Sequence, residues 1–238
     1  MREDENYFIF AGKKCTDFDA WVDGSGTYVS PSRDVDTISV PGRNGDLHED
    51  NGRFANYTVT FDTCIPHAAA DKLDAFRAWL LSVRGYHKLV EYCHPDYFWM
   101  AEYLDSLDPK MGTRNQFATF DTKFNVKPQR YLASGAQTRT ITSGTKLYNP
   151  TRYEAKPLLR CYGTGTITVG SISATVSAIN KSYTDIDSEL QDCYEGTANR
   201  NSYVSLTGHT FPTLPAGQTG ITFTGFTKVE LTPRWWTI

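Results

Sequence analysis

The stretch Phe-Asp-Thr-Lys-Phe-Asn-Val-Lys at residues 120–127 alternates between side chains suited to a core and side chains suited to water. Residues 57–62, Tyr-Thr-Val-Thr-Phe-Asp, repeat this alternation. A period of two is typical of a β-strand with one face buried and the other solvated. The two stretches therefore predict a half-buried β-sheet in the first half of the chain.

Between these two strands the apolar period lengthens to three and four residues. The residues on this stripe are Ala69, Leu73, Phe76, Leu80 and Val83. Pro66 lies near its start and Gly85 just past its end, which are the usual positions of these residues around a helix. We expect one amphipathic helix that covers an open side of an N-terminal β-sandwich. Trp79 and Leu81 widen the stripe and suggest burial on more than one side.

The second half of the chain predicts short strands and no helix. Residues 133–238 contain 20 threonines, and threonine favours strands over helices. The expected strands are Leu158–Tyr162, Ile167–Val169, Ile172–Val176, Val204–Leu206, Ile221–Phe223 and Val229–Leu231. Turns rich in Gly and Pro separate them, as in an antiparallel sandwich or a jelly roll.

A boundary between two domains is expected near residues 133–138, whose sequence Ala-Ser-Gly-Ala-Gln-Thr is small and polar. The predicted domains are residues 1–132, with a formal charge of -5, and residues 133–238, with a charge of +2. The whole chain has 238 residues and a charge of -3. Without a basic run, this balance argues against nucleic-acid recognition.

The sequence predicts a protein that is made in a cytoplasm and does not insert into a membrane. Its start is acidic and has no apolar signal region, and no apolar run approaches the roughly 20 residues that span a bilayer. The five cysteines are odd in number and widely spaced, so we expect reduced, mostly buried thiols.

The densest acidic set is Asp185, Asp187, Glu189 and Asp192. Alternation would place Asp185, Asp187 and Glu189 on one strand face. Such carboxylates could bind calcium or act as the acid and nucleophile of a glycosidase. A solvated strand face or a subunit contact is the alternative. No nucleotide loop, nucleophile elbow or zinc spacing is present in the sequence. We therefore expect no catalytic site, no metal and no cofactor.

Residues 38–47, Ile-Ser-Val-Pro-Gly-Arg-Asn-Gly-Asp-Leu, combine an apolar start with a turn dense in charge and glycine. Asn44-Gly45 favours positive φ and predicts a tight hairpin turn. A second turn signal follows at residues 50–53, Asp-Asn-Gly-Arg. Either an ordinary surface hairpin or a subunit contact has this composition.

These residues resemble the N-terminal signature of the distal tail protein (Dit) family of siphophages. Further stretches similar to the family follow in order: residues 76–80 with 85–86, 94–96, 127–130, 149–151, 156–158, 186–189, 211–212 and 233–236. The resemblance spans nearly the whole chain, and the order of its pieces is more specific than any one of them.

The resemblance implies a structural protein of a virion tail tip, from a siphophage or prophage. Family members form a homo-hexameric ring that joins the tail tube protein to a tail-associated hub or lysin protein. The ring also anchors the host-adsorption apparatus, with its receptor-binding and baseplate proteins. The first domain would build the ring, and the second would be a galectin-like antiparallel β-sandwich.

Two other classes of function stay open from the sequence. A glycan-binding adhesin module of a phage tail would need an exposed aromatic residue beside polar groups on one sheet face. An enzyme is disfavoured because no acid and nucleophile pair stands out.

The expected assembly interface is the stretch from Pro41 to Phe54. Its candidate residues are Pro41, Arg43, Asn44, Gly45, Asp46, Asp50, Arg53 and Phe54. Arginine can pair bidentately with carboxylates across a ring, which gives register as well as attraction.

Overall fold

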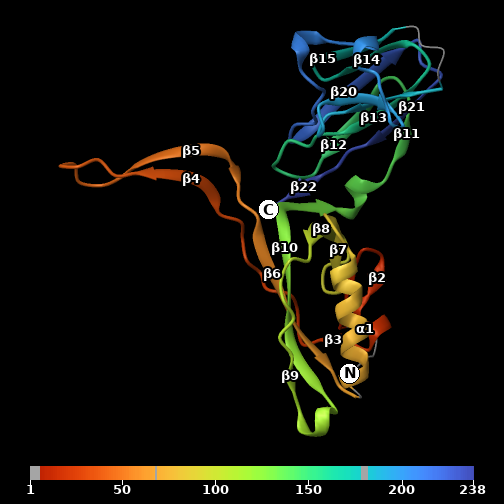
Figure 1. Cartoon of the computed structure of the whole chain (residues 1–238). Helices are drawn as coiled ribbons and strands as arrows, with labels where there is room; N and C mark the ends of the chain where they lie inside the picture. Colours follow the sequence, from red (N-terminus) through yellow and green to blue (C-terminus); the bar gives the residue numbers. More distant parts are fainter. Residues whose placement is uncertain (1–5, 68, 178–181) are drawn as a thin grey trace. The chain divides into compact units, whose positions relative to one another are not determined.

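The computed structural model describes residues 6–67, 69–177 and 182–238. The chain divides into two compact units, residues 1–130 with Ile238 and residues 131–237 (Figure 1). Antiparallel strands dominate both units, and α1 (Ala69–Ser82) is the single α-helix within the described ranges. The mainly β fold class with one helix, predicted from the sequence, is therefore confirmed.

The first unit is built on one antiparallel sheet. Its strands follow the order β2-β1-β7-β8-β10-β6-β3, and β9 pairs with β10. Their bounds are β1 (Phe8–Phe10), β2 (Lys13–Lys14), β3 (Trp21–Val22), β6 (Tyr57–Ile65), β7 (His87–Glu91), β8 (Tyr97–Glu102), β9 (Lys110–Met111) and β10 (Ala118–Leu132). Two short 3-10 helices, η1 (Cys15–Phe18) and η2 (Thr113–Asn115), connect them.

The two alternating stretches of the sequence form the long pair β6 and β10. Their register runs from Tyr57 opposite Val126 to Ile65 opposite Ala118. Val59 and Phe61 on β6 are buried, and the charged positions of residues 120–127 face away from the core. The period of two thus identified both strands and the face that each one buries.

The helix α1 packs its predicted stripe into the core of this unit. Its buried residues are Ala69, Leu73, Phe76, Trp79 and Leu80. Gly85, just past the helix, has a φ of 77°. Trp79 widens the buried stripe as expected, but Leu81 is 59% exposed and does not.

Aromatic rings fill the space between α1 and the sheet. The ring centroids of Phe18 and Trp79 stack 4.6 Å apart, and those of Phe10 and Phe124 lie 4.8 Å apart. Phe8 contacts Phe61 at a centroid distance of 5.0 Å. Each such pair adds about 0.5–1.5 kcal/mol beyond the burial of its area. The rings therefore tie the helix to both halves of the sheet.

The second unit consists of two antiparallel sheets. The first has the order β11-β21-β13-β16-β17-β18, and the second has the order β12-β20-β14-β15-β19. Their bounds are β11 (Arg139–Ile141), β12 (Thr145–Asn149), β13 (Leu158–Tyr162), β14 (Gly165–Val169), β15 (Ile172–Val176), β16 (Thr184–Asp187), β17 (Asp192–Glu195), β18 (Ala198–Asn199), β19 (Val204–Leu206), β20 (Gly217–Thr224) and β21 (Lys228–Thr232). The chain also forms η3 (Ala133–Ala136), η4 (Asn201–Tyr203), η5 (Thr207–His209) and β22 (Trp236–Thr237).

All six strands expected in this half are present, three of them with the predicted bounds. The two sheets enclose an apolar core that includes Leu159, Ile167 and Ile221, each of them fully buried. Trp235 is 3% exposed in the same core, and Trp236 stacks on Tyr153 with ring centroids 4.4 Å apart. The tryptophan pair therefore packs against the second unit.

The five thiols are unpaired and differ widely in exposure. Cys15, Cys161 and Cys193 are buried, Cys64 is partly buried and Cys93 is exposed. Burial raises the pKa of each of the three buried thiols to about 12. Since the thiolate is the reactive form, these three groups are chemically inert in the folded protein.

We predict that a thiol reagent added to the native protein labels Cys93 rapidly, Cys64 slowly and the other three cysteines hardly at all. The absorbance of the thiolate that the reagent releases measures the rate of labelling. Cys93→Ser should remove the fast phase. Under denaturing conditions all five groups should react. Fewer than five in denaturant, or three fast thiols in the native state, would contradict the assignment.

Candidate assembly interface

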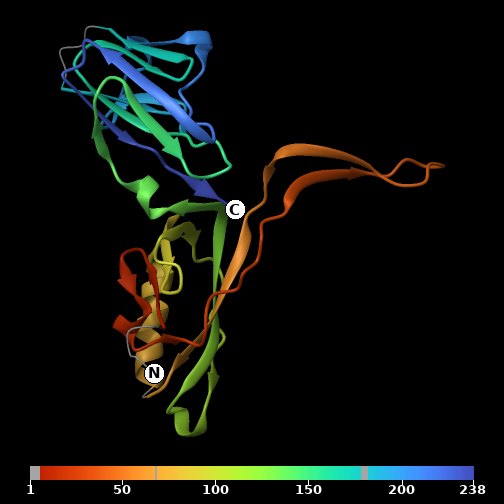
Figure 2. The same ribbon diagram turned by 180° about the vertical axis from the view of Figure 1, so that it is seen from behind.

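The stretch singled out from the sequence lies in a long β-hairpin of the first unit. The strands β4 (Arg33–Ile38) and β5 (Leu47–Phe54) pair only with each other in the described structure, as a sheet of two strands. We call residues 33–54 the arm. It extends away from the sheet of its own unit as an orange ribbon in Figure 1, and Figure 2 shows the same from behind. Eight strand residues span about 27 Å.

The tip of the arm is shaped by Pro41 and two glycines. Gly42 and Gly45 both have a φ of 81°, a conformation that glycine adopts without strain. The amide of Arg43 donates to the carbonyl of Val40 at 3.1 Å, which closes a turn around Pro41-Gly42. The tip is therefore formed by a turn at Pro41-Gly42 and a bend at Asn44-Gly45, where the sequence predicted a turn.

Two of the predicted interface charges are already paired within the arm. Asp50 accepts from the guanidinium of Arg33 at 3.1 Å, and Arg53 pairs with Asp34. The amide of Gly52 and then Arg33 hold the pKa of Asp50 below its usual value. These pairs are exposed, so they align the two strands more than they stabilise the fold.

The charges at the tip have no such partner. Arg43 and Asp46 are exposed, and neither forms an ion pair with any residue in the described ranges. Asn44, Pro41 and Gly45 beside them are exposed as well. Of the residues predicted for the interface, those at the tip are therefore exposed together, whereas Asp50 and Arg53 already form ion pairs within the arm.

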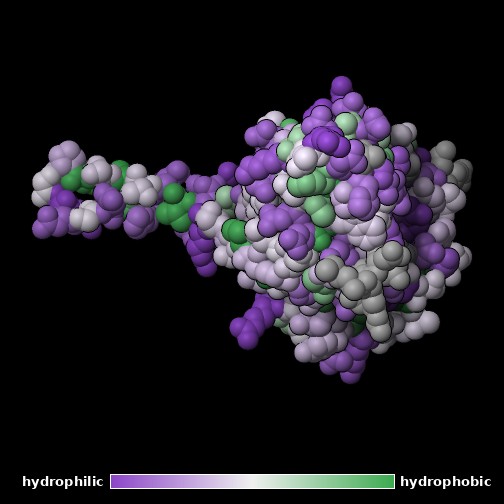
Figure 3. All heavy atoms as spheres, turned by 90° about the horizontal axis from the view of Figure 1, so that it is seen from below, coloured by the Kyte–Doolittle hydropathy of each residue, from purple (hydrophilic) through white to green (hydrophobic). Residues whose placement is uncertain are grey.

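An apolar pair lies next to these free charges. Ile38 and Leu47 are directly opposite each other in the arm and are 47% and 39% exposed. At the other end of the arm, Phe54 is half-buried, and the Arg33 guanidinium lies over its ring, 5.7 Å from the ring centroid. Figure 3 shows the arm as a narrow projection on which apolar residues lie among polar ones. The distal arm thus combines an apolar contact surface with unpaired charge, as interface patches do.

The irregular segment that leads from β3 into the arm is held to the sheet by a buried carboxylate. Glu91, at the end of β7, is 2% exposed and accepts from the amide of Gly26 at 3.3 Å. A Cβ at Gly26 would lie 2.9 Å from the Glu91 carboxylate, so only glycine fits there. His94 pairs with Glu91 at 2.6 Å and bonds the Tyr28 hydroxyl at 3.3 Å.

The strand that leaves the arm is held by two further bonds. The side-chain amide of Asn56 donates to the Tyr86 hydroxyl at 2.7 Å, and the Trp99 indole donates to the Tyr57 hydroxyl at 2.8 Å. Both roots of the arm are therefore attached to the body of the unit. Nothing local in the sequence indicated this, because each bond joins residues at least 30 positions apart.

The acidic strand predicted in the second unit is buried, not solvated. Asp185 is 2% exposed and accepts two bonds from Arg160, at 2.7 and 2.9 Å. Asp187 is 1% exposed and accepts two bonds from Arg234, at 2.6 and 2.8 Å. Glu189 lies beyond the end of β16, 3.5 Å from Arg234. Both buried carboxylates are occupied by guanidinium groups, so neither is free to ligate calcium or to attack a sugar.

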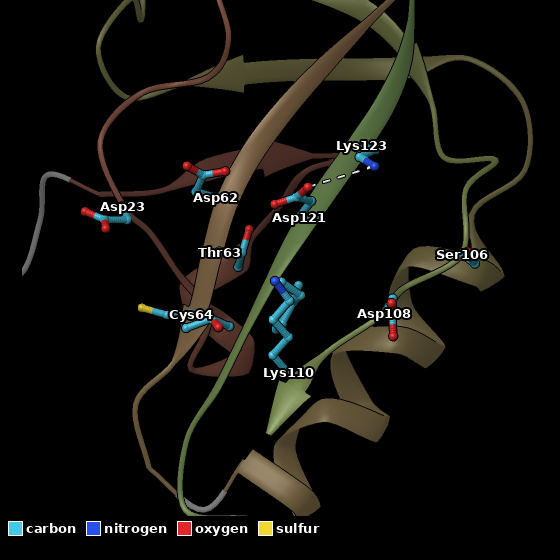
Figure 4. Close-up of a pocket in the computed structure, with 11 residues that line it drawn as sticks. Asp23, Asp62, Thr63, Cys64, Ser106, Asp108, Lys110, Asp121 and Lys123 are labelled. Atoms are coloured by element: carbon cyan, nitrogen blue, oxygen red, sulfur yellow. Dashed lines mark ion pairs between the residues drawn. The ribbon is translucent and has the colours of Figure 1, made fainter. Parts of the chain in front are cut away.

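A hollow of the first unit, 440 Å³ in volume, contains no arrangement of side chains suited to catalysis. Figure 4 shows that charged residues of β6, β9 and β10 line it, including Asp62 and Asp121, which face each other across the two strands. Lys123 lies 3.9 Å from Asp121. Burial and then the charge of Asp23 raise the pKa of the Cys64 thiol, which makes it a poor nucleophile.

No group of three or more His, Cys, Asp or Glu in the described ranges has a geometry that could hold a metal ion. Among the same residues, no helix is both long and apolar enough to cross a bilayer.

Comparison with known proteins finds a similar fold among solved structures. The sequence matches no family model and no curated protein. The structure resembles that of the SPP1 Dit protein (gp 19.1), from the hub adsorption apparatus of phages that infect Gram-positive hosts. The two chains are 12% identical, and the match covers 94% of this chain and 96% of that one with a TM-score of 0.71. The likeness establishes a shared fold over both units.

We predict that Asp187→Asn lowers the free energy of unfolding of the second unit by roughly 3 kcal/mol, because it removes the buried carboxylate that pairs bidentately with Arg234 and leaves only the more distant and more exposed Glu189. Thermal or urea unfolding measures the loss. The exposed Glu154→Gln in the same unit is the control and should change stability by less than about 0.5 kcal/mol. Equal effects of the two substitutions would contradict the assignment.

The same carboxylate predicts how stability depends on pH. Burial raises the pKa of Asp187, but Arg234 and the amides of Leu190 and Glu189 outweigh it and hold the pKa below its usual 3.8. Its contribution is therefore complete above about pH 4 and is lost as the pH falls below that value. Asp187→Asn should reduce the drop in stability between pH 5 and pH 3, as measured by urea unfolding. An unchanged drop would contradict the assignment.

Proposed function

We propose that this chain is a structural protein of a phage tail tip and that six copies form a ring at the end of the tail tube. The ring joins the tube to a tail-associated hub protein and carries the proteins of host adsorption. The fold shared with SPP1 Dit over both units supports this proposal, as does the order of the sequence stretches that resemble the Dit family. In this proposal the first domain builds the ring, and the second is a galectin-like sandwich.

The arm is the single observation that carries the proposal. A hairpin of two strands is marginally stable by itself in water, and this one has few contacts beyond its own strands and its roots. Its ion pairs are exposed and add little. A ribbon of this kind is best explained by contacts with another molecule, which would bury its apolar side chains and pair its backbone edges.

A second copy of this chain is the partner that the arm fits best. A contact between two different surfaces of identical chains closes into a ring when the rotation per subunit divides the circle. The first domain carries a charge of -5, so its copies repel at low salt. In this proposal the apolar pair Ile38 and Leu47 of the projecting arm provides the attraction between copies. Arg43 and Asp46 pair with charges of the neighbouring copy and so fix the relative position of the two chains.

Reversing the free charge at the tip tests this arrangement. We predict that Arg43→Glu weakens self-association by about tenfold or more, because the new carboxylate repels the group that Arg43 faces. Sizing with mass detection measures the assembly, and unchanged thermal unfolding would show that the fold is intact. Arg53 is unsuitable for this test because its pairing with Asp34 lies within the arm.

The matched control is Arg152→Glu, which makes the same change at an exposed position of the second unit. It should leave the ring intact. A wild-type chain that stays monomeric at every concentration would contradict the ring. Intact rings from Arg43→Glu would contradict the role of the tip.

A further inference from the structure

The outer face of the five-stranded sheet in the second unit is rich in hydroxyl groups. On β14, β15 and β20 the inward positions, among them Ile167, Ala174 and Ile221, are buried. The outward positions alternate with them. The outward positions with hydroxyl groups are Thr166 and Thr168 on β14, Ser173 and Thr175 on β15, Ser205 on β19, and Thr222 and Thr224 on β20. The other two outward positions of β20 are Gln218 and Gly220.

The strand register arranges these hydroxyls in two parallel rows. Thr224 faces Thr166, Thr166 faces Thr175, and Thr175 faces Ser205, so one row crosses four strands. In the second row, Thr222 faces Thr168 and Thr168 faces Ser173. Neighbouring strands lie about 4.8 Å apart, so the hydroxyls in each row are evenly spaced.

Cross-strand hydrogen bonds hold part of this array in place. The hydroxyls of Thr166 and Thr175 are 2.9 Å apart, and those of Thr168 and Ser173 are 2.8 Å apart. The array is also accessible, because Thr175, Ser205, Thr222 and Thr224 are all exposed. The face therefore presents ordered hydroxyl groups to solvent, and each hydroxyl can both donate and accept a hydrogen bond.

An aromatic ring stands on the same face. Tyr148, on the edge strand β12, is 68% exposed and lies directly opposite Gln218 of β20. Between this pair and the hydroxyl rows, Lys146 faces Gly220, which has no side chain. On β20, the backbone at Gly220 is therefore not covered by a side chain of its own between Gln218 and the hydroxyl rows.

The side chains of this face favour one chemical class of ligand over the others. Anionic polymers need clustered Lys and Arg, and here Lys146 is the one charged residue among the outward positions of the five strands. The centre of the face is polar, whereas protein interfaces have an apolar centre. By contrast, the outer face of the other sheet carries charged pairs such as Arg160 and Asp185. A ligand with regularly repeated, uncharged hydroxyls complements the hydroxyl rows best.

We propose that this hydroxyl face, with Tyr148 at its edge, binds a neutral polysaccharide. Sugar hydroxyls exchange hydrogen bonds with the two rows, and the exposed ring of Tyr148 packs against the apolar face of a sugar ring. The repeat of the strands matches a ligand that is itself a repeating chain. This binding is separate from ring assembly, which the proposed function assigns to the first domain.

Affinity gel electrophoresis of the full chain tests the site, with dextran, hydroxyethyl cellulose or galactomannan in the gel and heparin as the anionic control. At least one neutral polymer should retard the wild-type protein. Tyr148→Ala, and separately the double variant Thr222→Val with Thr224→Val, should each weaken that retardation by about tenfold. Valine keeps the β-branched shape of threonine and removes only the hydroxyl.

The control is Thr140→Val, at an exposed threonine of the other sheet, which should bind as the wild type does. Circular dichroism and thermal unfolding check that each variant is folded. The proposal is overturned if none of the three neutral polymers retards the wild type, or if heparin alone does. It is equally overturned if folded Tyr148→Ala and the valine double variant bind as tightly as the wild type.

Discussion

The pairing of β6 with β10 is the constraint on which the rest of the first unit depends. Its register turns Phe61 and Phe124 toward α1 and leaves Thr60 opposite Lys123 on the other face. A slip of one residue would exchange the two faces and remove the core beneath the helix. The chain that leaves the arm also enters this pair directly at Tyr57, so the same register sets where the arm begins.

Charge is used differently in three parts of the molecule. In the second unit, Asp185 and Asp187 are buried and each is matched by one guanidinium, so their charges act inside the fold. Along the arm, exposed ion pairs add to the antiparallel pairing of two strands that contact no other strand of the described structure. At the tip, Arg43 and Asp46 have no partner in the described structure. Unpaired charge beside an exposed apolar pair is what distinguishes the tip from the rest of the surface.

Local patterns in the sequence were enough to predict the long strands β6 and β10, six strands of the second unit and the helix α1. The alternation at residues 120–127 and the stripe of α1 both depend on neighbours a few positions away. The partners of the charges could not be predicted, because Arg160 lies 25 residues from Asp185 and Arg234 lies 47 from Asp187. For the same reason Asp185 and Asp187 had the pattern of a solvated strand face, and Asp50 and Arg53 had that of free interface groups. The Glu91 attachment of the arm left no local signal at all.

Hydrogen–deuterium exchange in dispersed and assembled protein tests most directly whether the arm acts between molecules. The account predicts fast exchange of the β4 and β5 amides in the monomer, because an isolated ribbon opens easily, and strong protection of the same amides after assembly. The β6 and β10 amides should be protected in both states. Slow exchange of the arm in the monomer, or no gain in protection on assembly, would contradict it.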